Sequence, residues 1–269
     1  MLDPVTRDRA LQAAEAAVEV AGSVIRPFFR SGIATHTKDD RSPVTIADRT
    51  AERVMRAVLT ERMPEAGILG EEFGLEQPEA RLRWVLDPLD GTRAFITGRP
   101  TFGILLALLV DDEPVLGLID QPVLRERWTG VAGRPTRFTG PFGGGTAGIA
   151  TTRRGMALSE AELSCTAPGM MDDRTRPGFQ RLEAAVRRSS WGGDCYGYGL
   201  LALGQIDVVA ERDMKPWDWA ALVPVVEGAG GRITDWSGRP LRADGDGSVL
   251  AVGDPALLAP CVACLSAAA

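Results

Sequence analysis

The sequence predicts an α/β protein in which layers of helices alternate with mixed β-sheets. Helical hydrophobic periodicity dominates the chain up to residue 62, and apolar runs of strand length follow it. Further along, helical segments alternate with strands and with short antiparallel pairs, an order that is typical of layered α and β structure. The 269 residues are enough to bury one large core or two closely packed ones.

Two helices are expected at the N-terminus, over residues 4–30 and 45–62, because apolar side chains recur there at helical spacing. The buried side of the second helix is expected to comprise Ile46, Val54, Val58 and Leu59. A polar loop containing His36, the only histidine, lies between the helices. A Ser-His-Asp triad would have to use His36, and no G-x-S-x-G motif is present. Carboxylates and hydroxyls must therefore carry any catalytic chemistry.

Strands dominate the middle of the chain. They are expected at residues 68–69, 81–87, 101–122 (a pair joined at the acidic turn 111–114) and 125–140, with a helical turn starting in 91–98. In the second half, strands are expected at 161–169, 206–211, 232–236 and 247–253, and helices at 178–189, 194–205, 217–231 and the C-terminal end.

The glycine-dense segment Gly140–Gly148 predicts either a domain joint or a long hairpin tip. It lacks the G-x-x-x-x-G-K-[ST] order of a nucleotide-binding loop. We expect an N-terminal α+β region at residues 1–145 and a C-terminal α/β region at residues 146–269. The first would carry most metal ligands and the phosphate loop, and the second Asp218 and the residues that select the substrate.

Charge and hydropathy exclude several classes of protein. A net charge of -6 and a pI near 5.0 argue against a nucleic-acid partner, which requires a basic face. The best apolar run, Ile104–Val110, is only of strand length, so no membrane span is expected. Acids occur throughout the N-terminal segment, which does not resemble a secretory signal, and a cytoplasmic protein is expected.

The four cysteines do not predict a metal site. Cys261 and Cys264 form a lone C-x-x-C close to the C-terminus, and a zinc site needs about four ligands. These two residues are expected to be small apolar residues on the final helix.

Three acid-bearing stretches carry the functional prediction. They are "GEE" with Glu71 and Glu72, "DPLDGT" with Asp87 and Asp90, and "KPWDWAA" with Asp218. Each adjoins an apolar run, so each acid is expected at the end of a buried element. Converging carboxylates repel one another unless cations lie among them, and oxygen-only ligands select Mg²⁺ or Mn²⁺. Because Mg²⁺ usually completes its ligand shell with water and phosphate oxygens, a phosphate substrate is indicated.

Gly91 and Thr92 support the phosphate prediction. Glycine lets the backbone approach a ligand closely, and a helix opening at Thr92 would present free N–H groups to an anion. The alternative for "DPLDG" is a proline-glycine turn with solvated acids. The two other acid-bearing stretches argue against this alternative.

Taken in this order, the three stretches resemble the inositol monophosphatase-like superfamily of magnesium-dependent, lithium-sensitive phosphatases. The resemblance covers nearly the whole chain and implies an αβαβα sandwich, two or three Mg²⁺ ions per site with Mn²⁺ possible, and a homodimer. It implies that the metal ligands are Glu71, Asp87, the Leu89 carbonyl, Asp90 and Asp218. It also implies that Asp48 and Thr92 orient the attacking water together with Glu71, and that the Gly91 and Thr92 amides bind phosphate.

The segments "DPLDGTRAFITGRPTFG" and "WGGDCYGYGLLALGQIDVVAERDMKPWDWAA" are similar to the histidinol-phosphate phosphatases of this superfamily. That branch implies hydrolysis of L-histidinol phosphate in histidine biosynthesis. Asp194 and Glu211 would then bind the non-phosphate end of the substrate, because carboxylates pair with its ammonium and imidazole groups. Asp194 is alternatively the N-cap of the following helix.

Other interpretations stay open at this point. The substrate could be inositol 1-phosphate, another sugar phosphate or a 3′-phosphoadenosine compound, and a non-catalytic regulator with the same fold is the alternative from a different class. Arg93 and Arg99 could reach the phosphate, a neighbouring subunit or only solvent.

Overall fold

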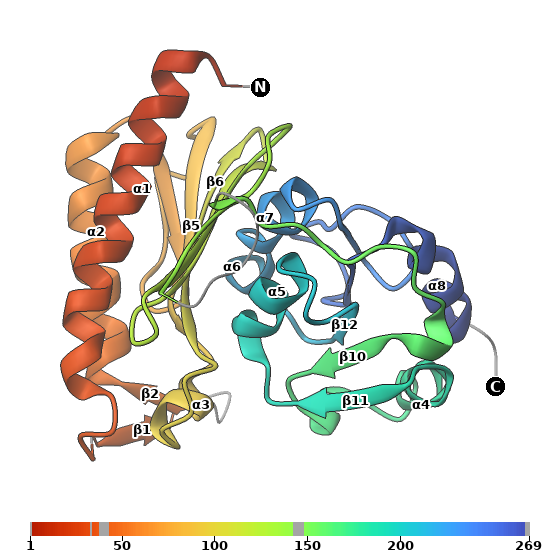
Figure 1. The fold of residues 1–269 in the computed structure, drawn as a ribbon. Coiled ribbons are helices and arrows are strands. Elements are labelled where there is room, and N and C mark those ends of the chain that lie inside the picture. Colours follow the sequence, from red (N-terminus) through yellow and green to blue (C-terminus); the bar gives the residue numbers. More distant parts are fainter. Residues whose placement is uncertain (1, 33, 38–42, 142–147, 267–269) are drawn as a thin grey trace.

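The structure is a computed structural model that describes residues 2–32, 34–37, 43–141 and 148–266. Its layers follow the order helices, large sheet, helices, small sheet, helices, as Figure 1 shows from left to right. The predicted αβαβα architecture is therefore confirmed. The predicted division at residue 145, within the glycine-dense segment, falls among residues 142–147, which lie outside the described residues.

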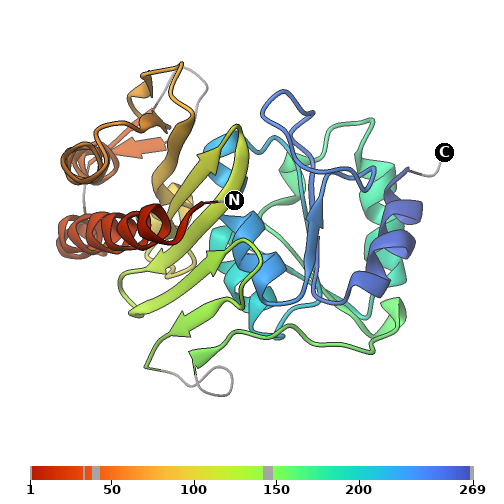
Figure 2. The same ribbon diagram turned by 90° about the horizontal axis from the view of Figure 1, so that it is seen from above.

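The first layer consists of α1 (Pro4–Ile25) and α2 (Ile46–Arg62), which pack side by side against the large sheet (Figure 2). Helix α1 begins where the Asp3 carboxylate accepts the N–H groups of Val5 and Thr6. It ends earlier than the predicted residue 30, since Pro27 lacks an amide N–H and the chain continues as a 3₁₀ turn.

Helix α2 begins with a capping box. The Thr45 side chain accepts the backbone N–H of Asp48, and the Asp48 side chain accepts the backbone N–H of Thr45. The predicted buried side was wrong for Ile46, which is 51% exposed, because this residue lies in the first turn beyond the edge of the sheet-facing stripe. Val54 and Val58 are half-buried, and Leu59 is fully buried.

The large sheet has seven strands in the order β4-β3-β5-β6-β7-β8-β9. Their bounds are β3 (Gly67–Gly70), β4 (Gly74–Glu76), β5 (Leu82–Asp90), β6 (Gly103–Val110), β7 (Glu113–Gln121), β8 (Glu126–Val131) and β9 (Arg137–Thr139). Strands β3 and β5 are parallel, and the other pairs are antiparallel. Every residue of β6 is buried, which explains the apolar run Ile104–Val110. Among the described residues, no helix combines the length and the apolarity that crossing a bilayer requires.

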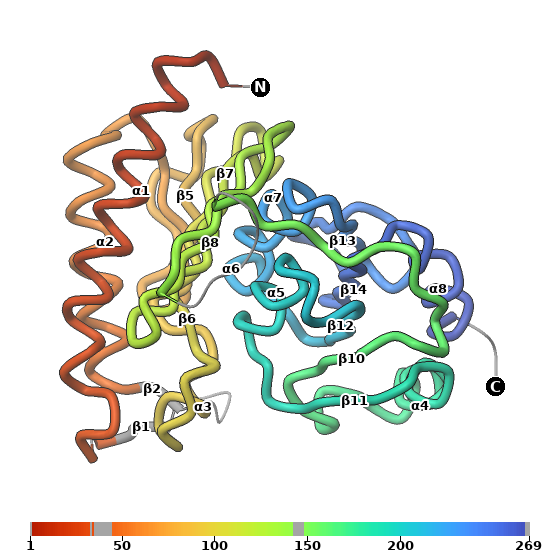
Figure 3. The backbone as a smooth tube through the Cα atoms, viewed as in Figure 1, coloured from red at the N-terminus to blue at the C-terminus, as the bar shows by residue number. Residues whose placement is uncertain are grey.

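The small sheet has five strands in the order β11-β10-β12-β14-β13, which Figure 3 shows one above another from β11 at the bottom to β13 at the top. Their bounds are β10 (Glu162–Cys165), β11 (Arg188–Trp191), β12 (Val208–Glu211), β13 (Arg232–Thr234) and β14 (Val249–Val252). Strand β11 was not predicted. Its first two residues were assigned to the end of the helix predicted at 178–189 and the last two to no element, because this exposed edge position carries no alternating apolar pattern.

Helices α5 (Asp194–Ala202), α6 (Pro216–Trp219) and α7 (Leu222–Gly228) lie between the two sheets. The sequence predicted one helix over 217–231, but the structure divides it into α6 and α7. Pro224 has no amide N–H to donate to the carbonyl of Ala220, so a continuous helix would lack a hydrogen bond there.

The outer layer consists of α4 (Arg176–Ala185) and α8 (Leu258–Ser266), which pack on each other over the small sheet. A short α3 (Thr92–Ile96) follows β5. The final helix carries Cys261 buried and Cys264 half-buried, both as free thiols, as predicted. The expected polar loop after α1 instead contains β1 (Thr35–Thr37), which holds His36 and pairs with β2 (Pro43–Thr45).

The middle helices approach the large sheet closely because the sheet carries glycine where they meet. A Cβ atom at Gly117 would lie 2.1 Å from the carbonyl oxygen of Ala221, and one at Gly130 would lie 2.3 Å from the carbonyl carbon of Pro224. The start of α7 therefore lies on bare strand backbone.

We expect Gly117→Ala to lower the free energy of unfolding by about 1 to 3 kcal/mol, because its methyl group must displace helix backbone in a packed layer. Chemical denaturation would measure the change. Gly169→Ala is the matched control, since a Cβ atom there meets nothing within 4 Å. Equal stability of the two variants would contradict the close contact between α7 and β7.

Candidate active site

Three carboxylates from two distant segments meet at one edge of the large sheet. Asp87 and Asp90 lie at the end of β5 and Asp218 lies in α6, and one oxygen of each is within 4.8 Å of the others. We call these three residues the acid cluster. Strand β5 shifts register against β6 between Asp87 and Asp90, where Pro88 has no N–H for the ladder. The shift lets both aspartates of one strand reach the cluster.

Backbone amides hold each carboxylate in place. Asp87 Oδ1 accepts the N–H of Leu89 at 2.8 Å, and Asp90 Oδ2 accepts the N–H of Cys195 at 2.7 Å. Asp218 Oδ2 accepts the N–H of Lys215 at 2.6 Å. These bonds fix the orientation of the oxygens before any ligand arrives.

The acid cluster is electrostatically strained on its own. Burial raises the pKa of Asp87 well above its usual value, and the charges of Glu71, Asp90 and Asp218 raise it further. Burial likewise raises the pKa of Asp218 to about 7. Carboxylates that repel one another out of water, with oxygen as the only ligand atom, suit a hard divalent cation. The residues present therefore fit a bound metal ion.

Glu71 comes to the same edge because β3 and β5 run parallel, so the segments that follow their carboxyl ends are neighbours. Its N–H donates to the carbonyl of Leu86 at 3.3 Å. Its charge acts on both Asp87 and Asp218.

Thr92 joins this edge to helix α2. Its hydroxyl oxygen lies 3.2 Å from Asp48 Oδ1 and 3.2 Å from the Leu89 carbonyl oxygen. Both oxygens are acceptors for the single hydroxyl proton of Thr92. The second oxygen of Asp48 accepts the backbone N–H of Thr45 at 3.0 Å. Burial raises the pKa of Asp48 above its usual value.

Gly91 follows Asp90 of the acid cluster and packs against Asp194. Its φ of +83° is in the left-handed region, and a Cβ atom there would lie 3.0 Å from both Cβ and Cγ of Asp194. Only glycine satisfies both the backbone angle and the lack of space. The loop predicted to bind phosphate is thus covered on one side by the Asp194 side chain.

A cavity of about 160 Å³ adjoins the acid cluster. We call it the acidic cavity; it is lined by Asp90, Thr166, Met170, Asp194, Cys195, Glu211, Arg212, Asp213, Met214 and Asp218. The structure therefore brings Asp194 and Glu211 to the same place as the acid cluster, although they come from α5 and the end of β12.

Asp194 and Glu211 differ in how they are held. Asp194 accepts the hydroxyl of Thr101 at 3.3 Å and is half-buried. Glu211 is 3% exposed and accepts the N–H of Thr166 at 2.7 Å and the hydroxyl of Tyr198 at 3.0 Å. Burial raises the pKa of both carboxyls. The alternative that Asp194 is an N-cap was wrong, because Gly193 occupies that position and Asp194 is the first helical residue.

Arg93 and Arg99 both lie near Asp194. Their charges lower its pKa, in opposition to the larger effect of burial, with Arg99 the stronger of the two. The predictions missed the polar groups of Thr101, Thr166 and Tyr198, which gain their roles only through contacts between distant segments.

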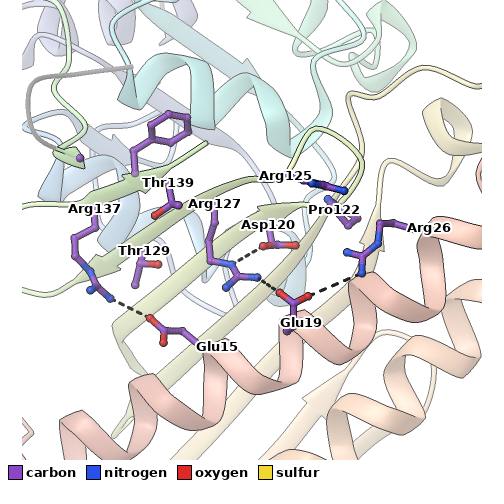
Figure 4. A pocket seen from close by; sticks show the side chains of 12 residues that line it. Glu15, Glu19, Arg26, Asp120, Pro122, Arg125, Arg127, Thr129, Arg137 and Thr139 are labelled. Carbon is purple, nitrogen blue, oxygen red and sulfur yellow. Dashed lines mark hydrogen bonds and ion pairs between the residues drawn. The ribbon is translucent and has the colours of Figure 1, made fainter. Parts of the chain in front are cut away.

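A larger cavity, of about 790 Å³, contains none of the predicted site residues and lies between α1 and strands β7–β9. Figure 4 shows that its charged side chains face one another. Arg127 bridges Asp120 at 2.5 Å and Glu19 at 3.2 Å, and Arg137 binds Glu15 at 3.1 Å. These ion pairs attach α1 to the sheet.

Comparison with known proteins assigns this chain and its architecture to one class, the phosphatases that act on small-molecule phosphate esters. The chain belongs to the inositol monophosphatase family, whose model matches residues 6–266. Enzymes of this family depend on divalent metal ions.

Several relatives are similar over most of the chain. The bifunctional phosphatase IMPL2, chloroplastic, of Arabidopsis thaliana is 44% identical over 91% of this chain and 69% of its own length. The histidinol-phosphatase of Chlorobaculum parvum is 36% identical over 90% of this chain and 91% of its own. Among solved structures, an inositol monophosphatase from Zymomonas mobilis aligns with a TM-score of 0.87 and 45% identity, covering 99% of this chain and 100% of that chain.

We expect the thermal stability of the metal-free protein to fall as pH rises from about 4 to about 7. The folded-state pKa of Asp218 is about 7 and its usual value is 3.8, so the folded state binds the extra proton in this window. Raised pKa values at Asp87 and Asp90 act in the same direction.

Excess Mg²⁺ should reverse this trend, because the ion replaces the protons. The rise in melting temperature caused by Mg²⁺ should therefore grow between pH 5 and pH 8, as measured by scanning calorimetry. An Mg²⁺ effect that does not change with pH would argue against metal binding at these carboxylates.

Proposed function

We propose that this protein is a Mg²⁺-dependent phosphomonoesterase that hydrolyses L-histidinol phosphate to L-histidinol and phosphate. The observation that carries this proposal is the charge of the acidic cavity. Its described lining includes five carboxylates and one base, Arg212, whose guanidinium pairs with Asp246 at 2.8 Å. Such a cavity suits a substrate whose alcohol part is cationic.

The two ends of the substrate would meet different carboxylates. Asp90 and Asp218 serve the phosphate end, together with Asp87, through divalent ions. Asp194, Glu211 and Asp213 are left for the ammonium and imidazole groups. Both oxygens of Glu211 already accept hydrogen bonds, so it contributes charge, whereas Asp194 is half-buried and offers the direct contact.

The relatives support a cationic substrate. Histidinol-phosphatases from Chlorobaculum parvum and Mycobacterium tuberculosis are both 36% identical to this chain. An inositol ring carries hydroxyl groups only, so it can donate hydrogen bonds to the carboxylates beyond the acid cluster but gives them no cationic partner.

The proposed metal ligands are Glu71, Asp87, the Leu89 carbonyl, Asp90 and Asp218. When bound, divalent ions supply Lewis-acid activation of the phosphoryl group and of the attacking water. The N–H groups of Leu89, Cys195 and Lys215 keep the aspartate oxygens oriented for this purpose.

Asp48 and Thr92 have the proposed role of orienting the attacking water. The Thr92 hydroxyl donates its proton toward Asp48, so its lone pair is free to accept a proton from the water. The raised pKa of Asp48 favours its acting as the final proton acceptor. The amides of Gly91 and Thr92 would bind phosphoryl oxygens where negative charge develops.

Inositol-1-phosphate phosphatase is the second candidate. It is favoured by the 45% identity to the Zymomonas mobilis inositol monophosphatase and by the 34% identity to the inositol-1-monophosphatase ImpA of Mycolicibacterium smegmatis. Phosphate release from histidinol phosphate and from inositol 1-phosphate, measured side by side, distinguishes the two candidates.

We expect Asp90→Asn to lower kcat/KM by about 1,000-fold, because it removes a charge that stabilises the transition state through the metal ion. The fold should persist, since the amide has nearly the same size as the carboxyl group. Steady-state kinetics at saturating Mg²⁺ would measure the loss, and circular dichroism would check the fold. Full activity in this variant would remove Asp90 from the metal site.

We expect Asp194→Ala to lower kcat/KM for histidinol phosphate by about 10-fold to 100-fold, the effect of losing a charge-assisted hydrogen bond. Hydrolysis of p-nitrophenyl phosphate, which carries no cation, should change far less. Asp244→Ala removes an exposed acid that is outside the acidic cavity and serves as the control. Equal losses on both substrates would refute the proposed recognition of a cation by Asp194.

A further inference from the structure

Helix α2 carries three charged residues at intervals of four, which places them on one face of the helix. Asp48, Glu52 and Arg56 are all buried, at 2%, 0% and 8% exposure, and this face lies toward the large sheet. Asp48 already has a partner in Thr92. Glu52 and Arg56 contact a different part of the site.

Glu52 binds the turn that begins with Glu71. Its Oε2 accepts the N–H of Glu72 at 2.8 Å, and its Oε1 accepts the N–H of Phe73 at 3.1 Å. We call residues 71–73 the Glu71 turn. A buried carboxylate therefore holds the two amides that directly follow a proposed metal ligand.

Gly70 provides a separate indication that this turn is built around Glu52. A Cβ atom at Gly70 would lie 2.1 Å from Glu52 Oε1 and 2.9 Å from Arg56 Nη2. The end of β3 can approach α2 this closely only without a side chain at that position.

Arg56 completes the arrangement. Its Nε donates to Glu52 Oε1 at 2.9 Å, and its Nη2 donates to the Gly74 carbonyl at 2.5 Å. It also pairs with Glu76 at 3.1 Å. Arg56 balances the buried charge of Glu52 and fixes the far side of the turn, so the charge of Glu52 is tolerated away from water.

We propose that Glu52 is a positioning residue that orients Glu71 for metal binding by holding the Glu71 turn. The inference rests on the proposed role of Glu71 as a metal ligand. Outer partners that orient metal-binding side chains are worth about 10-fold to 100-fold in metal affinity. Since Asp48 orients Thr92 from one turn earlier, a single face of α2 sets both the Glu71 turn and the Thr92 loop.

Glu52→Gln tests this proposal, because it keeps the size of the side chain and replaces one acceptor oxygen by a donor. Mn²⁺ binding, measured by electron paramagnetic resonance without substrate, should weaken by about 10-fold or more. Glu76→Gln is the matched control: it removes another carboxylate that contacts Arg56 but lies on β4, outside the Glu71 turn, so Mn²⁺ affinity should stay within about twofold of wild type.

Glu71→Gln, measured in the same way, separates two kinds of failure. If Glu71→Gln weakens Mn²⁺ binding and Glu52→Gln does not, the positioning role of Glu52 is overturned and the metal site stands. If Glu71→Gln has no effect, the proposed ligand set itself fails, and the inference fails with it.

Hydrogen exchange of the metal-free wild-type protein gives a test that needs no variant. The amides of Glu72 and Phe73 should exchange at least about 10-fold more slowly than unprotected amides, because a buried carboxylate accepts both. Exchange at the unprotected rate would overturn the proposal, even if Glu52→Gln failed to fold. In folded Glu52→Gln, the same two amides should lose protection while those in the middle of α1 keep theirs.

Discussion

Several carboxylates are buried together at one edge of a sheet, and this electrostatic conflict determines much of the surrounding structure. Asp87 is buried and Asp90 and Asp218 are half-buried, so water screens their mutual repulsion only in part. Backbone amides bind and orient each of these carboxylates. The register shift at Pro88 brings Asp87 and Asp90 together, and the parallel pairing of β3 with β5 brings Glu71 beside them. None of these features removes the repulsion. A divalent cation would do so, which is why the site is arranged to receive one.

Some of this arrangement could be predicted from local sequence. Asp87 follows a buried apolar strand, so its place at the end of β5 was evident without knowledge of the rest of the fold. The division between α6 and α7 was not evident from the sequence. It depends on the hydrogen bond to the Ala220 carbonyl that Pro224, which lacks an amide N–H, cannot donate. Strand β11 was missed because its exposed edge position leaves no apolar pattern. Glu52 was also missed, although an acid one turn after Asp48 on a buried helix face was a usable signal.

In the proposed function, the carboxylates of the acidic cavity serve two purposes, metal binding and recognition of the substrate's cationic group. The aspartates of the acid cluster are close enough to share an ion, whereas Asp194 packs against Gly91 with two arginines nearby, although its charge also acts on Asp90. Arg93 and Arg99 favour the charged form of Asp194 against the effect of burial. In the proposed function Asp194 meets the cationic group of the substrate, and the two arginines offset part of the effect of burial on its pKa.

The two kinds of group come from different halves of the chain. Asp48, Glu71, Asp87, Asp90 and Thr92 belong to the large sheet and its covering helices, whereas Asp194, Glu211 and Asp213 surround the small sheet. Asp218 joins the two sets, because it comes from the second half of the chain and lies in the acid cluster. In the proposed function, the residues that select the alcohol come mainly from the second half of the chain and the phosphate-binding groups mainly from the first. Such a division of labour gives a family an evolutionary route to new substrates without rebuilding its chemistry.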